Sequence, residues 1–385
     1  MIVKHLRVKN WRNFQSIDTA LQERQFLVGP NASGKSNFLD IFRFLRDVAK
    51  TEGGGMQKAL KDRGGLSKIR CFAARKDPEV SIEIELAKDA ESPTIWIYAI
   101  GIKQENKGTR NSYLSYEKVT QNGKLILERP NTEDKKDPQR LTQTFLEQIG
   151  FNAEFRPMAK FLQSINYLHL VPQLLRYADR IQGRIIEDDP FGQSFLERIA
   201  KTPEKTRRAR LKKIEEALKI AVPQLQQLEF MRDSNGKPHL QATYQHWRPK
   251  AGLQKEDQFS DGTLRLIAFI WSLLEGDSPL LLEEPELSLN SGIVAQLAPL
   301  MYKAQRVKGR QLIISTHSEA LLSDGGIDGA EVLMLVPKTE GTKTILASDD
   351  ADVRNLLSQG FGMSEVVLDS IKPEMVSKVS QLTLF

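Results

Sequence analysis

Polar and apolar residues alternate along the first stretch of the chain, which predicts a half-buried strand over residues 2–9. A second strand is predicted at Gln25–Val28, where the apolar run Phe26–Val28 stops at Gly29. Apolar residues then recur across residues 35–49 at the spacing of one helix face. A strand, a glycine-bearing turn and a helix are therefore expected in succession.

The pattern changes twice in the middle of the chain. Alternating apolar residues and turn residues predict several strands within residues 80–129. Residues 131–140 are polar and charged, which predicts an exposed linker, and residues 141–222 have mainly helical spacing. The α/β pattern returns after Phe230. We therefore expect an α/β core interrupted by a strand-rich segment and a helical segment.

The composition describes an ordinary globular protein, with 40% apolar and 27% charged residues among 385. A net charge of +6 permits contact with nucleic acid or acidic partners without requiring it. The single cysteine, Cys71, excludes a disulfide within the chain and fits a reducing compartment. No signal peptide and no apolar run of the ~18 residues needed to span a membrane is present, so we expect a cytoplasmic protein.

Residues 29–36 match the pattern of a phosphate-binding loop. A strand enters the loop and a helix leaves it, an arrangement that directs main-chain N–H groups toward a single anion site. Lys35 is expected to reach the β- and γ-phosphates, and the Ser36 hydroxyl to bind Mg²⁺. A chance match in a strand–turn–helix segment is the alternative. The nucleotide-binding residues expected here are Gly29, Pro30, Asn31, Ala32, Ser33, Gly34, Lys35 and Ser36.

A second stretch, Leu280–Leu282, reads as a buried strand that ends in carboxylates. Ligands of α/β sheets bind at such strand ends, so Glu283 is a candidate Mg²⁺ ligand and Glu284 a candidate base for the attacking water. Side chains alternate along a strand, so both carboxylates face one way only if the chain turns, which Pro285 favours. An acidic helix N-terminus, with Glu286 before an apolar segment, is the alternative.

Two further segments add weaker signals. Ser260 or Asp261 would cap the apolar helical run 264–274, whose N-terminus could then face an anion, although a simple helix cap is an equal alternative. The buried strand 312–314 leads to His317, which could contact a γ-phosphate, although a lone histidine is more often structural.

Taken in order, the phosphate-binding loop, the serine-containing turn, the acidic strand and the histidine resemble the ABC-type ATPases. The variant is similar to the RecF, SMC and OLD-type group, and within it to bacterial stand-alone AAA family ATPases, often encoded beside an effector protein and linked to antiphage defence. The segments that carry this resemblance are Leu6–Phe14, Pro30-Asn31, Glu283-Glu284-Pro285-Glu286 and Ser315-Thr316-His317-Ser318. It covers residues 1–50 and roughly 255–345.

The resemblance implies an α/β fold, an ABC ATPase head with a mixed central sheet, an antiparallel β lobe and a helical insertion. The expected divisions are an ATPase core at 1–75 and 230–345, a β lobe at 76–130, a mainly helical insertion at 141–229 and a C-terminal segment at 346–385.

The resemblance also implies an ATPase with ATP and Mg²⁺ as cofactors, and Glu284 and His317 as catalytic residues. Two chains would form a head-to-tail homodimer around ATP, with Ser260 and Gly262 of one chain at the γ-phosphate held by Lys35 of the other. ATP would then join the subunits, and hydrolysis would release them.

Three positions differ from the family pattern or match it loosely. Asn290 and Glu283 stand where an Asp is more usual, so the contact from Glu283 to the metal could run through water. Gln173 is a candidate for the family's glutamine-bearing loop, with a surface glutamine as the favoured alternative.

The biological role stays open at this level. The first hypothesis is a molecular switch that regulates DNA or a separate effector protein, in antiphage defence or DNA repair. The alternatives are the nucleotide-binding subunit of a membrane transporter and an ATP-binding scaffold with little turnover. The basic residues within 201–219 predict either a face for nucleic acid or a partner, or a merely solvated helix face. The segment after His317 is too short for the OLD-type nuclease domain, so we expect any effector to be a separate protein.

Overall fold

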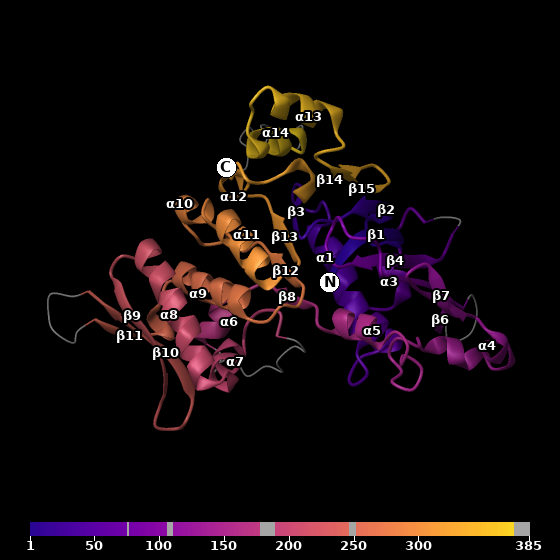
Figure 1. The fold of residues 1–385 in the computed structure, drawn as a ribbon, viewed down its shortest axis with the longest axis horizontal. Coiled ribbons are helices and arrows are strands. Elements are labelled where there is room, and N and C mark those ends of the chain that lie inside the picture. Colours follow the sequence, from indigo (N-terminus) through magenta and orange to yellow (C-terminus); the bar gives the residue numbers. More distant parts are fainter. Residues whose placement is uncertain (75–76, 106–110, 178–188, 246–251, 373–385) are drawn as a thin grey trace, which may run out of the picture. The chain divides into compact units, whose positions relative to one another are not determined.

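The computed structural model describes residues 1–74, 77–105, 111–177, 189–245 and 252–372. The chain divides into two compact units (Figure 1). The first unit holds Met1–Asn166, Ser278–Leu281 and Gly309–Phe385, and the second holds Tyr167–Asp277 and Leu282–Lys308.

An antiparallel sheet of six strands dominates the N-terminal part of the first unit, in the order β2-β1-β4-β5-β6-β7. Its strands are β1 (Ile2–Trp11), β2 (Phe14–Ala20), β4 (Val80–Ala87), β5 (Trp96–Gln104), β6 (Ser112–Gln121) and β7 (Lys124–Arg129). The predicted strand at the start of the chain is confirmed, because Leu6 and Val8 are buried while Arg7 and Lys9 are exposed.

A second, mixed sheet has the order β15-β14-β3-β13-β12-β8. Its strands are β3 (Arg24–Val28), β8 (Asn166–Leu168), β12 (Leu280–Glu283), β13 (Leu312–Thr316), β14 (Val332–Lys338) and β15 (Gly341–Leu346). Strand β3 is parallel to β13 and β14, and β15 returns antiparallel to β14. A mixed sheet beside an antiparallel one confirms the predicted α/β class.

Helix α1 (Lys35–Ala49) is the predicted amphipathic helix, and its apolar face is buried. Phe38 packs edge-on against Phe14 at 6.3 Å between ring centroids, and Phe44 packs against Trp11 at 5.2 Å. Each such buried ring stabilises the fold by about 1.5–3 kcal/mol. The remaining helices of this unit are α2 (Met56–Asp62), α3 (Leu66–Ile69), α4 (Thr132–Lys136), α5 (Arg156–Gln163), α12 (Glu319–Leu322), α13 (Ala351–Ser358) and α14 (Met363–Ser370).

A side-chain amide joins the two sheets at one end of β1. The Gln311 amide is fully buried, accepts from Val3 N at 2.9 Å, and donates to Val3 O at 2.8 Å and to Gln22 O at 2.9 Å. At the other end of β1, Thr342 N donates to Asn13 O at 2.8 Å. The two sheets of the first unit are therefore hydrogen-bonded to each other at both ends of this strand.

Residues 131–140 are mostly exposed, as expected, but the segment is partly helical and not a plain linker. It forms α4 and a 3₁₀ helix at Pro138–Thr142. The reason is a capping box between Asn131 and Asp134, combined with an ion pair of 2.9 Å between Asp134 and Arg129. Both side chains of the pair are fully buried. A buried carboxylate and guanidinium neutralise each other, which a count of polar residues does not reveal.

The second unit contains mainly helices and one small sheet. Its helices are α6 (Pro172–Arg176), α7 (Phe195–Lys201), α8 (Glu204–Ala221), α9 (Asp261–Leu274), α10 (Ser291–Val294) and α11 (Leu297–Lys308). Its antiparallel sheet consists of β9 (Leu225–Arg232), β10 (Pro238–Tyr244) and β11 (Leu253–Lys255).

Strand β8 is only three residues long. It ends at Leu168, because the N–H groups of His169 and Val171 donate to the carbonyls of Pro190 and Phe191. These donors are therefore satisfied by a loop, and the chain turns into α6 at Pro172.

A half-buried carboxyl in the first unit is held by main-chain donors. Glu147 accepts from Thr144 N at 2.7 Å and from Met56 N, the start of α2, at 2.8 Å. Gly55, at φ +94°, passes so close that an added Cβ would overlap the Glu147 carboxylate. Burial raises the pKa of Glu147 to about 7, and the nearby Glu117 adds to that effect, against the two N–H donors.

This pKa predicts that stability falls as the pH rises. The folded protein keeps the Glu147 proton up to about pH 7, whereas the unfolded chain releases it near 4.5. The stabilising contribution is therefore complete below about pH 4.5 and is lost by about pH 7, at a cost of about 1–3 kcal/mol. Urea unfolding at pH 5.5 and 8 measures this difference. We expect Glu147→Gln to flatten it, while the exposed control Glu154→Gln leaves it intact; an unchanged slope in Glu147→Gln would contradict the assignment.

Candidate functional site

The predicted phosphate-binding loop lies at the end of β3, between two parallel strands. Val28 is paired with Thr316 of β13 on one side and with Met334 of β14 on the other. Parallel neighbours end at the same edge of a sheet, and ligands of α/β sheets bind at that edge. The first unit thus brings His317, which follows Thr316, to the same edge as residues 29–34.

Both glycines of the loop are required by their surroundings. A Cβ on Gly29 would overlap the Ser33 side chain and lie 2.8 Å from Leu335 O. Gly34 has φ +99°, and a Cβ there would overlap the side chain of Asn13. The main chain therefore packs closely against its neighbours at both glycines, where any other residue would clash.

The loop ends in the N-terminus of α1, where Lys35 is the first helical residue. The first turn of this helix contains no acidic residue, so the positive end of the helix dipole is not neutralised there. The Lys35 side chain is 7% exposed, and its Nζ donates to Gly29 O at 2.8 Å and Pro30 O at 3.2 Å. A cation, a helix N-terminus and a strand end together form an anion-binding arrangement.

A residue outside the loop fixes its shape. Asn13 Nδ2 donates to Ser33 O at 2.9 Å and to Thr342 Oγ1 at 2.8 Å, and the Thr342 hydroxyl donates to the same Ser33 carbonyl at 2.9 Å. Asn37 Nδ2 in turn donates to Asn13 Oδ1 at 2.8 Å. Sequence reasoning placed Asn13 in the opening segment but gave it no role, since nothing local to Asn13 indicates Ser33 or Thr342.

His317 is exposed at the start of the turn that follows β13. Its neighbour Ser318 caps the short helix α12, accepting from Leu321 N at 3.3 Å, and Ser318 N donates to Thr316 Oγ1 at 3.0 Å. These bonds fix the backbone on both sides of the imidazole, which orients the residue without burying it.

The acidic strand end lies in the second unit. Strand β12 ends at Glu283, and Glu284 has φ +45°, so the expected turn of the chain is present. A positive φ is uncommon for a residue with a side chain and costs on the order of 1 kcal/mol, which the neighbouring structure must offset. The Tyr167 hydroxyl donates to Glu283 Oε2. Sequence reasoning did not single out Tyr167, which is 116 residues away from that carboxylate.

Ser260 is the N-cap of α9, as expected, and its Oγ accepts from Thr263 N at 3.1 Å. A Cβ on Gly262 would lie 2.6 Å from Ser288 O, so this glycine permits close packing against the segment after the acidic strand. Asp261 forms an ion pair with Arg176 at 2.6 Å. The exposed Gln173 also donates to Asp261, at 2.6 Å, which gives this glutamine a contact with the serine-containing turn.

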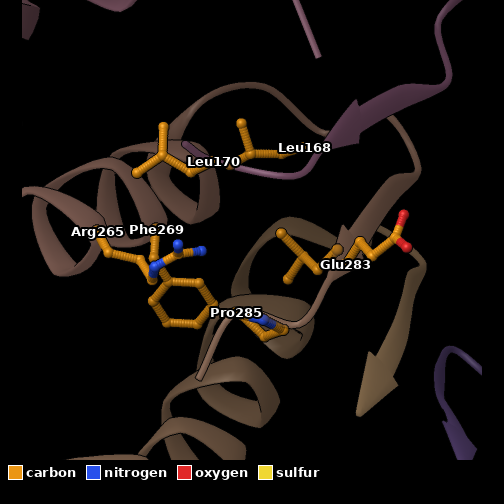
Figure 2. Close-up of a pocket in the computed structure, with 7 residues that line it drawn as sticks. Leu168, Leu170, Arg265, Phe269, Glu283 and Pro285 are labelled. Atoms are coloured by element: carbon orange, nitrogen blue, oxygen red, sulfur yellow. The ribbon is translucent and has the colours of Figure 1, made fainter. Parts of the chain in front are cut away.

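A cavity of about 10 Å³, room for about one water, lies beside the acidic strand (Figure 2). Its lining residues are Leu168, Leu170, Arg265, Phe269, Leu282, Glu283 and Pro285. The Arg265 guanidinium points toward the cavity, whereas the Glu283 carboxylate points away from it. Burial lowers the pKa of Arg265, although Asp261, Glu286 and Glu284 oppose that shift. The field of Arg265 thus acts on the acidic strand end.

The basic residues of 201–219 differ in what they contact. Arg207 stacks on Phe230 with its guanidinium carbon 4.1 Å from the ring centroid, and Arg210 stacks on Trp271 at 5.1 Å. These two arginines are part of the packing of α8. Lys205, Lys212 and Lys213 are exposed and form no ion pair with the residues that the structure describes.

Within the described ranges, no cluster of three or more His, Cys, Asp or Glu residues could hold a metal ion. Mg²⁺ commonly binds one or two protein oxygens together with phosphate oxygens of a nucleotide. A hydroxyl at Ser36 and a carboxylate at Glu283 are of this donor type. None of the helices described is long and apolar enough to cross a membrane.

Comparison with known families decides the assignment. A family described as "AAA domain, putative AbiEii toxin, Type IV TA system" matches residues 26–323. The chain belongs to this family. Membership of an AAA family indicates nucleotide binding and hydrolysis, and it confirms the expected resemblance to ABC- and SMC-like ATPases.

Two solved structures share the fold of this AAA protein. One is an SMC head bound to the C-winged helix domain of ScpA, with a TM-score of 0.52, 14% identity, and coverage of 90% of this chain and 97% of that chain. The other is an SMC head with an extended coiled coil, bound to the C-terminal domain of ScpA from Pyrococcus furiosus, with a TM-score of 0.50, 13% identity, and coverage of 93% and 98%. Among proteins of curated function, none matches this chain.

The support of the loop by Asn13 predicts a graded loss of nucleotide affinity. Asn13→Ala removes one donor to Ser33 O and leaves the other donor, Thr342, in place. A hydrogen bond of this kind contributes about 0.5–1.5 kcal/mol, so we expect ATP affinity to fall roughly three- to tenfold. Titration with a fluorescent ATP analogue measures the change. Asn235→Ala, in an exposed turn, is the control, and equal affinities for both variants would contradict the role of Asn13.

Proposed function

We propose that this AAA protein is an ATP-driven molecular switch, which dimerises around ATP and separates after hydrolysis. The observation that carries the proposal is the loop at residues 29–36. Its glycines admit no side chain, its lysine lies at the N-terminus of a helix without acidic residues in the first turn, and its strand is flanked by parallel strands. This arrangement suits a triphosphate better than any other common ligand.

Binding would replace internal contacts with contacts to phosphate. Lys35 Nζ would exchange the carbonyls of Gly29 and Pro30 for oxygens of the β- and γ-phosphates. Main-chain N–H groups of residues 31–36 would donate to the same oxygens. Ser36 and Glu283 are the residues assigned to Mg²⁺, an ion that would neutralise the charge developing on the phosphates.

Hydrolysis requires a group that takes up a proton and donors that stabilise the γ-phosphate. We assign Glu284 to orient the attacking water and accept its proton, while the water oxygen bonds to the γ-phosphorus and the bond to the bridging oxygen of ADP breaks. His317, at the same sheet edge as the loop, is assigned to donate to a γ-phosphate oxygen. The products are ADP and inorganic phosphate.

The dimer would place a second chain over the nucleotide. Ser260 and Gly262 of that chain are assigned to the γ-phosphate, because the N-terminus of the 14-residue helix α9 begins there and Gly262 carries no side chain to block approach. Loss of the γ-phosphate would remove the ligand of this second helix N-terminus, which links hydrolysis to separation of the two chains.

The switch would act on DNA or on a separate effector protein, in antiphage defence or in DNA repair. The family description names a putative toxin of a toxin–antitoxin system, which supports a defence role. The SMC heads of similar fold are bound to domains of another protein, ScpA, which supports a protein partner. The exposed lysines of α8 are the surface we assign to nucleic acid, should DNA be the target.

Loss of the lysine tests the loop directly. Lys35→Ala removes the cation that meets the β- and γ-phosphates, so we expect ATP binding to fall below detection while the fold is retained. Isothermal titration with ATP, alongside thermal melting, measures both. Lys68→Ala removes an exposed lysine of α3 and should bind ATP as the parent does. Parent-like affinity in Lys35→Ala would overturn the loop assignment.

Loss of the proposed base should trap the closed state. Glu284→Gln keeps the size of the side chain but cannot accept a proton, so we expect turnover to fall roughly 10²–10⁴-fold and an ATP-dependent dimer to persist. Phosphate release and light scattering after size-exclusion chromatography measure the two effects, with the exposed Glu216→Gln as control. The trapped protein is also the reagent with which to isolate the effector or nucleic acid. Parent-like turnover in Glu284→Gln, or a parent without measurable phosphate release, would contradict the assignment.

A further inference from the structure

The Glu283 carboxylate accepts a hydrogen bond from a tyrosine of the second unit. Tyr167 lies in β8, the strand next to β12 in the sheet order, and its hydroxyl donates to Glu283 Oε2. Both side chains are only partly exposed. A phenol that donates to a carboxylate forms a charge-assisted hydrogen bond, roughly twice as strong as a neutral one.

Packing alone does not fix the direction of Glu283. The cavity of about 10 Å³ borders the aliphatic part of this side chain, together with Leu168 and Pro285 (Figure 2). A glutamate also has one more rotatable bond than the aspartate that is more usual at this position. Because there is space beside the aliphatic part of Glu283, and because its side chain has this additional rotatable bond, the direction of the carboxylate depends on its polar contacts.

We infer that Tyr167 is a positioning residue that orients the carboxylate of Glu283, the residue assigned above to Mg²⁺; this rests on the proposed function. A carboxylate has two oxygens with about four lone-pair positions, so it can accept from a phenol and still ligate a cation. Hydrogen bonds from neighbouring residues commonly set the orientation of metal ligands in this way.

The variant Tyr167→Phe tests this inference by removing a single hydroxyl. We expect Mn²⁺ binding to the ADP complex, followed by electron paramagnetic resonance, to weaken roughly tenfold. The Mg²⁺ concentration that half-saturates hydrolysis should rise by a similar factor, while ADP affinity in excess EDTA stays unchanged. Tyr113→Phe, which removes a partly exposed phenol in β6, is the matched control and should match the parent in all three measurements. Thermal melting establishes that both variants fold.

A second variant shows whether Tyr167 acts through Glu283. Glu283→Asp retracts the carboxylate from the phenol, so we expect it to weaken Mn²⁺ binding as well. In the double variant Tyr167→Phe/Glu283→Asp the loss should not exceed the larger single loss, because the interaction removed is the same. Additive losses would show that Tyr167 acts elsewhere and would overturn the inference.

Two outcomes separate this inference from the proposed function. If Tyr167→Phe binds Mn²⁺ as the parent does, the positioning role is wrong, even though Lys35→Ala has lost ATP. If Lys35→Ala retains ATP, the nucleotide site itself is misplaced and the inference fails with it.

Discussion

The carbonyl oxygen of Ser33 accepts hydrogen bonds from Asn13 and Thr342, which lie 20 residues before it and 309 residues after it. This pair of bonds fixes the peptide that precedes Gly34, and therefore the point where α1 begins and Lys35 emerges. The loop has no room for a Cβ at Gly29 or Gly34, so its position cannot relax by moving toward its neighbours. The anion-binding geometry of the loop is thus held by residues far away in the sequence, Asn13 and Thr342. The two glycines of the loop remove the side chains that would otherwise clash in this geometry.

Helices and strands with a clear local signal, such as apolar periodicity or a capping residue, could be predicted from the sequence. The strand before the loop, helix α1 and helix α9 each carry their own periodicity or cap, and all three are present. The contacts from Asn13 to Ser33 and from Tyr167 to Glu283 could not be predicted, because sheet pairing brings these residues together across long stretches of chain. No local pattern encodes such a pair.

Residues 131–140 are mostly exposed, as their polar sequence predicts, but one carboxyl in this stretch is not. Asp134 is buried together with Arg129, which precedes the stretch, and the two side chains pair with each other. The desolvation of the Asp134 carboxyl raises its pKa, but the Arg129 guanidinium and the Asn131 N–H outweigh it and hold the pKa below its usual value. Charge along a sequence therefore indicates exposure only where no opposite charge can fold onto it.

The side-chain amide of Gln311 offers both a hydrogen-bond donor and an acceptor, as a peptide group does, and this has a mechanical consequence. Its amide forms two hydrogen bonds with the main chain of Val3, as a residue of a neighbouring strand would, and so links the antiparallel and mixed sheets. Just beyond the other end of β1, the main-chain bond from Thr342 to Asn13 links the sheets again. A strand anchored at both ends resists sliding and hinging, because either motion would break buried bonds with no water to replace them. The antiparallel sheet and the strands β3, β13, β14 and β15 should consequently move as a single body.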